Sequence, residues 1–155
     1  WHSQFTEKDS NMAYATLDDL LQVEPTITEM GVIDYDAELA RSEQEVNRIL
    51  NVRWFQSYKA RNSKAVTFNP QLLTPSQWTQ ATVYHALAYH IAPKLTQFGE
   101  DGARDRFQVM MDYYSGRFEH ELDLCLREGV QYDLDDSGTV SVDEGAPTIQ
   151  LRLIR

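Results

Sequence analysis

The sequence predicts a mainly α-helical protein: a bundle of three long helices plus a short helix, with a small β-hairpin and a C-terminal strand. Three segments carry apolar residues at three- and four-residue intervals, which is the spacing of a helix that buries one face. After residue 129 the pattern changes to short β-prone pieces around a turn. A chain of 155 residues is long enough for one domain with a substantial core, but not for two.

We expect three parts along the chain. They are a leader or flexible N-terminus over 1–12, a helical bundle over 13–129, and an arm of hairpin and strand over 130–155. The chain opens on Trp1, whereas Met12 followed by a helix signal has the form of a translation start. Residues 1–12 therefore take no part in the prediction of the fold.

Two helices are predicted in the first part of the bundle. Thr16 has the position of an N-cap before two acidic residues, so a short helix covers about residues 17–22. A long helix begins at Asp34 or Asp36 and runs to about Trp54, because apolar residues recur at roughly helical spacing. These residues are Leu39, Val46, Ile49, Leu50, Val52 and Trp54.

The second long helix has a clear start signal, and the third has a clear end signal. Thr74 precedes a proline in the first turn, and Gln77 stands where a capping box needs it. The apolar stripe of this helix comprises Trp78, Ala81, Tyr84, Leu87, Ala88, Ile91 and Leu95, and Pro93 bends or ends it. The stripe of the third helix comprises Phe107, Met111, Tyr114, Phe118, Leu122, Cys125 and Leu126. Gly129 supplies the left-handed residue past its end.

The C-terminal part has the pattern of strands. Residues 130–132 and 139–142 are β-prone and flank a turn, and residues 148–155 mostly alternate apolar with polar side chains. A strand at the end of a helical chain leaves its backbone groups unpaired unless it finds a partner. We expect it to pair with the 130–142 hairpin or with another molecule. In the second case the contact residues are Ile149, Leu151, Arg152, Leu153 and Arg155.

Charge is unevenly distributed. The net charge is −10, made up of −8 over 1–50, +4 over 51–118 and −6 over 119–155. An acidic chain is a poor candidate for wrapping nucleic acid through phosphate neutralisation. Two interpretations of the pattern stay open: a mixed solvated surface, or copies that pack head to tail with unlike faces together.

Cysteine content and hydropathy indicate the compartment. Cys125 is the single cysteine and cannot form an intrachain disulfide, so we expect folding in a reducing compartment. No apolar run approaches the roughly 18 to 20 residues that span a bilayer, and no signal-peptide pattern opens the chain. We expect a soluble protein without a membrane partner.

Residues 133–144 match the twelve-residue loop of an EF-hand. The oxygen ligands would be Asp133, Asp135, Ser137, Thr139 and Glu144, with Gly138 at the turn, because Ca²⁺ takes six to eight oxygens. The flanking residues do not fit an EF-hand, in which one helix enters the loop and another leaves it. Gly129 ends the entering helix, and Gly145 and Pro147 stop an exiting one. Two interpretations stay open: an acidic β-turn between short strands, or a weak Ca²⁺ site. We expect no other cofactor.

The histidines and the cysteine do not form a predicted site. His85 and His90 stand five apart, so on an α-helix they project about 140° apart and cannot share a metal as an i, i+4 pair does. His120 is expected in solvent, and Cys125 on the apolar stripe is expected to be an inert core thiol. The sequence has no phosphate loop, nucleophile elbow or His-Glu-x-x-His motif, so we expect no enzyme.

The order of these features resembles the head-to-tail connector proteins, also called head-completion or adaptor proteins, of tailed bacteriophages. The resemblance covers about residues 13–145. It comprises Ala13-Tyr-Ala-Thr-Leu-Asp-Asp-Leu20, the helix from Asp36 to Trp54, the Phe68-Asn-Pro-Gln-Leu-Leu-Thr-Pro75 entry to a Tyr/Ala-rich helix, and the helix from Phe107 to Leu126. Its most specific part is the final run, Gly129-Val-Gln-Tyr-Asp-Leu-Asp-Asp-Ser-Gly138.

The resemblance implies a structural virion protein without catalysis. Such proteins form a ring, commonly of about twelve copies, beneath the portal of the capsid, and they extend the DNA channel. The implied partners are copies of the same chain, the portal protein and the next neck or tail protein, while DNA passes without sequence-specific binding. The protein would be made in the host cytoplasm and reside in the virion neck. The alternatives are a calcium-binding interaction module built on residues 133–144, and an intracellular subunit built on a helical bundle.

Overall fold

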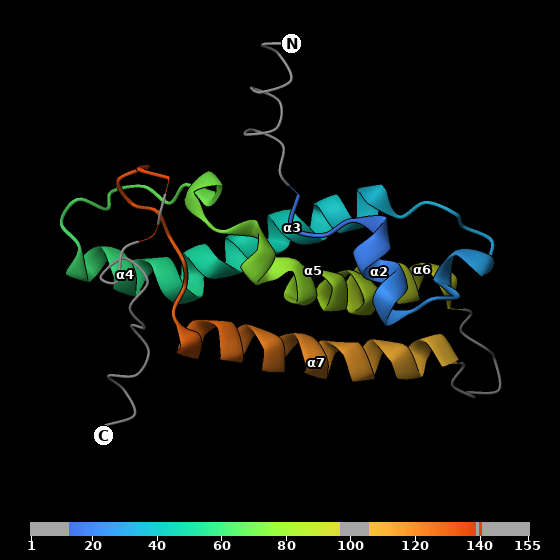
Figure 1. The fold of residues 1–155 in the computed structure, drawn as a ribbon. Coiled ribbons are helices and arrows are strands. Elements are labelled where there is room, and N and C mark those ends of the chain that lie inside the picture. The colour runs from blue at the N-terminus through green and yellow to red at the C-terminus, as the bar shows by residue number, and fades with distance from the viewer. Residues whose placement is uncertain (1–12, 97–105, 139, 141–155) are drawn as a thin grey trace, which may run out of the picture.

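Three long helical segments lie side by side in the computed structural model, which describes residues 13–96, 106–138 and 140 (Figure 1). The middle segment packs against the other two, so the bundle has three layers with its core between them. The prediction of a mainly α-helical bundle is therefore confirmed. None of the described helices is both long and apolar enough to cross a lipid bilayer.

A short helix precedes the bundle, as predicted. It is α2 (Leu17–Val23), and Thr16 and Asp19 form a capping box at its start. Leu20 is fully buried, so this helix contributes one anchor to the core. A short 3₁₀ turn, η1 (Ile27–Glu29), then leads toward the first long segment. The hydroxyl of Tyr35 donates a hydrogen bond to the carbonyl of Ile27 and so links the start of this segment to η1.

The first long segment is continuous from Asp36 to Arg61 and is longer than predicted. It comprises α3 (Asp36–Leu50), a π-helical turn η2 (Asn51–Phe55) and α4 (Gln56–Arg61). No glycine or proline interrupts these residues, so nothing local stops the helix at Trp54. At about 1.5 Å per residue the segment forms a rod roughly 39 Å long.

The second long segment contains four consecutive pieces. They are the 3₁₀ turn η4 (Pro75–Trp78), α5 (Thr79–Ala86), the π-helical turn η5 (Leu87–Ile91) and α6 (Ala92–Leu95). It follows another 3₁₀ turn, η3 (Pro70–Leu72). Pro93 lies in the first turn of α6, where its missing N–H is tolerated, and the helix ends shortly after it.

The predicted capping box at the start of this segment is wrong. The Thr74 side chain makes no capping hydrogen bond. The Gln77 side chain instead accepts from the backbone N–H of Gln131 at 3.0 Å and donates to the carbonyl of Gly129 at 2.9 Å. A tertiary contact with the chain after the third helix has therefore replaced a local cap.

The third long helix is α7 (Arg106–Glu128), and it agrees with the prediction. Its buried residues are Tyr114, Phe118, Leu122 and Cys125. Gly129 follows with a φ of 106°, and its N–H donates to the carbonyl of Cys125 at 3.2 Å. This left-handed residue ends the helix as its position in the sequence predicts.

The predicted hairpin is not present among the described residues, and they contain no strand. Its first arm, 130–132, returns to the 72–74 segment: the N–H of Asp133 donates to the carbonyl of Leu72 at 2.9 Å, and the N–H of Thr74 to that of Gln131 at 3.2 Å. Tyr132 and Leu73 form an isolated antiparallel bridge. Residues 139 and 141–142 of the second arm, and the predicted strand 148–155, lie outside the described residues.

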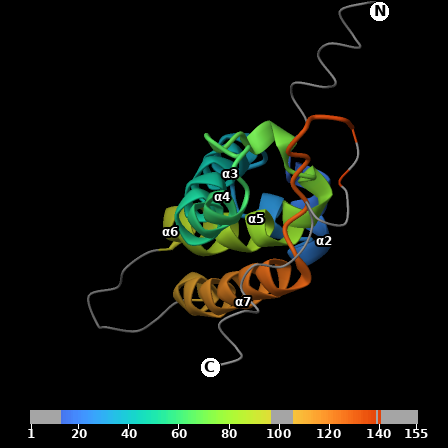
Figure 2. The same cartoon turned by 90° about the vertical axis from the view of Figure 1, so that its left-hand side faces the viewer.

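The core has two parts. One centres on aromatic rings and comprises mainly Trp54, Phe55, Tyr58, Trp78, Phe118 and Tyr132, with Phe68 packed against it. The other lies toward α2 and comprises mainly Leu20, Ile27, Tyr35, Leu87, Ile91 and Tyr114. Seen from the end of the molecule, α5 lies between α3 and α7, which explains why it contributes to both (Figure 2).

Candidate functional site

The acidic turn is held by its own hydrogen bonds. One carboxylate oxygen of Asp133 accepts from the N–H of Ser137 at 3.1 Å, and the other accepts from the N–H of Gly138 at 2.7 Å. Asp135 also accepts from the N–H of Ser137, at 3.2 Å. Asp136 and Gly138 have φ values of 54° and 96°, which a tight turn requires. Backbone donors thus hold the Asp133 carboxylate within the turn.

Two of the predicted calcium ligands, Thr139 and Glu144, lie outside the described residues. The same is true of every predicted partner-contact residue: Ile149, Leu151, Arg152, Leu153 and Arg155. The described residues therefore do not include either complete set, so the calcium site and the partner-contact surface remain predictions.

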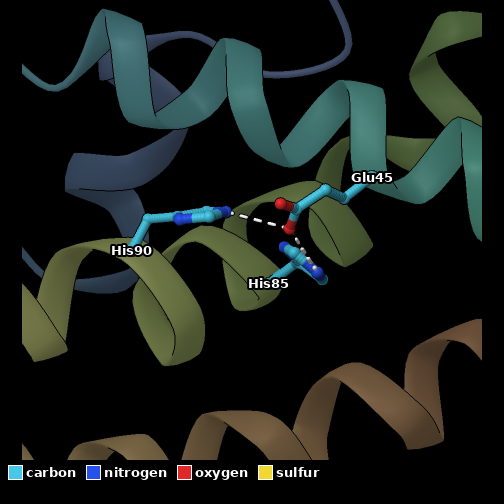
Figure 3. A group of neighbouring side chains, drawn as sticks. All are labelled: Glu45, His85 and His90. Atoms are coloured by element: carbon cyan, nitrogen blue, oxygen red, sulfur yellow. Dashed lines mark hydrogen bonds and ion pairs between the residues drawn. The ribbon is translucent and has the colours of Figure 1, made fainter.

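A different group of side chains comes together between the first two long segments. Glu45 projects from α3, His85 from α5 and His90 from η5, and all three meet in one place (Figure 3). The same carboxylate oxygen of Glu45, Oε1, lies 3.4 Å from Nε2 of His85 and 3.0 Å from Nε2 of His90. One ligand atom from each residue lies within 4.8 Å of the others.

The prediction that His85 and His90 point apart is wrong, and the π-helical turn is the reason. In a π-helix the hydrogen bonds run from residue i to i+5, so residues five apart fall on nearly the same side. The turn η5 occupies most of the interval between the two histidines. In a regular α-helix the ring of Pro93 would clash with the carbonyl four residues earlier. The irregular turn lies just ahead of that proline.

The two imidazoles are poorly accessible to solvent, whereas the carboxylate is not. The exposed fractions of the side chains are 6% for His85, 8% for His90 and 42% for Glu45. Burial lowers the pKa of His85 to about 4, an effect that the carboxylate of Glu45 opposes. His85 is consequently neutral at neutral pH and can act as a ligand or as a hydrogen-bond partner.

A fourth residue positions the His85 ring. Its Nδ1 lies 2.9 Å from the hydroxyl of Ser42, which is fully buried one turn before Glu45 on α3. The edge of the ring also contacts Phe118, with centroids 4.9 Å apart. These contacts fix the ring orientation and direct Nε2 toward Glu45.

The group opens onto a pocket in the surface. The pocket has a volume of about 330 Å³ and is lined by Glu45, Arg48, Ile49, Val52, Arg53 and His85. Arg53 is also ion-paired with Glu119 on α7, at 2.9 Å. The lining of the pocket therefore combines apolar side chains and two cations with one imidazole and one carboxylate.

The remaining singled-out residues behave as the sequence predicts. His120 is exposed on α7. Cys125 is buried, and burial together with the nearby Glu121 and Glu128 raises the pKa of its thiol to about 12. Such a thiol is unreactive at neutral pH.

Chemically, the Glu45, His85 and His90 group can either share protons through hydrogen bonds or hold a cation. The spacing of the residues in the sequence did not predict this group, because on a regular α-helix its two histidines would project about 140° apart. Pro93 was the available signal of an irregular turn. A proline within a helix clashes with the carbonyl four residues earlier, which here belongs to Tyr89. No protein-family model, curated protein or solved structure matches the chain.

Proposed function

We propose that this protein is a structural subunit of a tailed-phage virion, a ring-forming connector that sits beneath the portal, extends the DNA channel and joins head to tail. The sequence resemblance over residues 13–145 supports this role, and the mainly helical bundle is compatible with it. A ring is built from heterologous contacts, so each copy must offer two surfaces that differ and complement each other.

The observation that carries the proposal is a segregation of charge within the described chain. Residues 13–35 contain five acidic and no basic side chains, whereas residues 51–96 contain five basic and no acidic ones. The acidic set is Asp18, Asp19, Glu24, Glu29 and Asp34; the basic set is Arg53, Lys59, Arg61, Lys64 and Lys94.

Four of these residues lie toward opposite ends of one rod, whereas Lys94 is ion-paired with Glu38 at 2.7 Å in the first turn of α3. Glu29 and Asp34 are exposed on the connection that precedes α3, and we call them the acidic end. Lys59 and Lys64 are exposed at and just beyond the end of α4, and we call them the basic end (Figure 1). Contact between the acidic end of one copy and the basic end of the next would repeat around a ring.

Helix α7 offers an apolar surface that can extend such a contact. Val109, Tyr113 and Leu124 are 55%, 58% and 46% exposed, and their spacing puts them on one side of the helix. The buried residues of α7 lie on a different side. In the proposed ring a neighbouring copy covers this exposed stripe.

The proposal includes two further features, of which the first lies outside the described residues. The strand predicted over residues 148–155 would pair with a sheet of a neighbour or of the portal protein. Acidic side chains of the first or third charge zone would face the channel, where they repel phosphates and let DNA slide. Deleting residues 148–155 should weaken docking of the ring on portal-bearing capsids, and unchanged docking would contradict this part.

Charge reversal tests the proposed contact between copies. Lys59→Glu/Lys64→Glu and Glu29→Lys/Asp34→Lys should each disrupt assembly of the full chain, measured as the sedimentation coefficient at matched ionic strength. Carrying all four substitutions on one chain should restore assembly, since the two ends are complementary again. Arg41→Glu/Arg48→Glu changes two exposed basic residues on α3, between the two ends, and serves as the control with the same change in net charge as the lysine pair. Equal assembly of all variants would contradict the proposed contact.

The calcium-binding module remains the second candidate, carried by the match of residues 133–144 to an EF-hand loop. Calorimetric titration of the full chain with Ca²⁺ separates it from the connector. Millimolar or tighter binding that Asp133→Asn abolishes would favour the module, because that substitution removes the charge of the first ligand.

A further inference from the structure

We propose that Glu45, His85 and His90 form a binding site for one divalent transition-metal ion of the zinc class, with a coordination position open to the adjacent pocket. This inference concerns a different part of the molecule from the proposed ring contacts. It does not depend on the connector proposal.

Two of the three distances between the ligand atoms are close to those of a metal site. Zinc binds imidazole nitrogen and carboxylate oxygen at about 2.0 to 2.2 Å, so ligand atoms around a tetrahedral ion lie about 3.4 Å apart. Oε1 of Glu45 already lies 3.4 Å from Nε2 of His85 and 3.0 Å from Nε2 of His90. All three ligand atoms lie within 4.8 Å of one another, so the side chains would draw together around an ion between them.

The ligands come from two helical segments, which restricts their movement. Glu45 lies on α3, and the two histidines lie on either side of most of the π-helical turn η5. Such turns are frequent at functional sites because they change which residues share a side of the helix. Here the turn brings two imidazoles to a single carboxylate (Figure 3).

Ser42 supplies the outer contact that metal-binding histidines usually have. In metal sites the second ring nitrogen commonly donates to an oxygen, which fixes the tautomer and the ring orientation. The hydroxyl of Ser42 lies 2.9 Å from Nδ1 of His85 and is fully buried. If Nδ1 carries the proton and donates to Ser42, the lone pair of Nε2 points toward Glu45 and the ion.

The ligand types indicate the class of metal. Two imidazoles and one carboxylate suit Zn²⁺ and neighbouring first-row ions, whereas Ca²⁺ and Mg²⁺ prefer oxygen ligands alone. This donor set differs from that of the acidic turn 133–138, so the two candidate sites would respond to different ions. Three protein ligands leave a fourth position for water or another molecule.

The pocket determines what that further ligand can be. Glu45 is 42% exposed and contributes to the pocket wall, so an ion held there would be reachable from solvent. Arg48 and Arg53 line the same pocket of about 330 Å³. Arg53 is already ion-paired with Glu119, whereas the guanidinium of Arg48 favours an anion, and a small carboxylate would suit both that guanidinium and the ion.

Calorimetric titration with Zn²⁺ tests the site in the full chain after treatment with a chelator. We expect one Zn²⁺ per chain, with affinity reduced about 100-fold or more in Glu45→Gln and in His90→Gln because each removes a ligand. Glu128→Gln and His120→Gln change an exposed residue of the same type elsewhere and should bind as the original chain does. X-ray absorption of the zinc-loaded protein should show two imidazoles in the coordination sphere.

Two results would overturn the inference. One is the absence of stoichiometric Zn²⁺ binding to a chain whose circular dichroism shows the helical fold. The other is binding that Glu45→Gln and His90→Gln leave unchanged, which would place the ion elsewhere, for example at His2 or His120. Glu45→Asp, which keeps the charge but shortens the side chain, should retain helicity and still weaken binding, so loss of fold is separated from loss of a ligand.

Discussion

The ring of His90 lies 5.6 Å from that of His85, centroid to centroid, although five residues separate the two along the chain. The π-helical turn Leu87–Ile91 creates this proximity. Glu45 approaches from the neighbouring helix, and its single oxygen Oε1 meets both imidazoles. One local irregularity in a helix thus creates a polar group inside an otherwise apolar interface.

Replacing Ser42 should show how strongly this group depends on its buried hydroxyl. Ser42→Ala removes the oxygen next to Nδ1 of His85, and a buried polar atom that loses its partner costs about 1 to 3 kcal/mol. Urea denaturation of metal-free protein measures the change. In a Zn²⁺ titration the same variant should bind about 10- to 100-fold more weakly.

Ser57→Ala provides the matched control, since Ser57 is exposed on α4 and its loss should change stability by less than about 0.5 kcal/mol. Equal stability of the two alanine variants would mean that the contact between Ser42 and His85 is not significant.

Replacing Thr82 should raise the free energy of unfolding, whereas replacing Ser42 should lower it. Its hydroxyl is fully buried, and no hydrogen-bond partner exists for it among the residues that the structure describes. Thr82→Val keeps the shape and removes the cost of burying an unpaired hydroxyl, so the free energy of unfolding should rise by up to about 1 kcal/mol. The converse change at its neighbour, Val83→Thr, should lower it. A clear loss of stability in Thr82→Val would show that the hydroxyl has a partner after all.

Tyr132 connects the segment after α7 to the aromatic core. Its ring contacts Trp54 and Tyr58 at centroid distances of 5.3 and 5.4 Å, and its hydroxyl accepts from the N–H of Asn69 at 3.1 Å. Tyr132→Phe should therefore cost about 1 kcal/mol, and Tyr132→Ala about 3 to 5 kcal/mol. Thermal unfolding of both variants measures the two costs. Equal effects would mean that the ring packs less tightly than the structure indicates.

The thiol of Cys125 should be slow to react in the folded protein. Its raised pKa of about 12 leaves far less thiolate at pH 8 than an ordinary cysteine has, by about a thousandfold. Alkylation by iodoacetamide should be at least about 100-fold slower in buffer than in denaturant. Because the raised pKa shifts ionisation upward, the native rate should keep rising between pH 8 and 10 instead of levelling off near 9. Similar rates in buffer and denaturant would contradict the buried position.

Much of the helical framework could be predicted from the sequence, because local signals specify it. Thr16 and Asp19 cap the first helix, and Gly129 ends the last one, each through contacts within a few residues. The apolar stripes identified which faces pack together, and most of their residues are buried.

The parts of the fold and the site that were not predicted depend on contacts that a local sequence pattern does not indicate. Gln77 has the position of a capping residue, yet its amide binds the chain beyond α7. Residues 130–132 are β-prone, but among the described residues their backbone partner is the segment around Leu73, which is distant in the sequence. The site at Glu45 was missed for a similar reason, since an α-helical wheel cannot represent the π-helical turn before Pro93.

The association state of the purified full chain tests the central claim most directly. Native mass spectrometry combined with negative-stain imaging would count the copies and show whether they enclose a hole. We predict a closed ring with a central channel, held by the acidic and basic ends of adjacent copies. A protein that stays a single subunit at all concentrations and salt levels would contradict it.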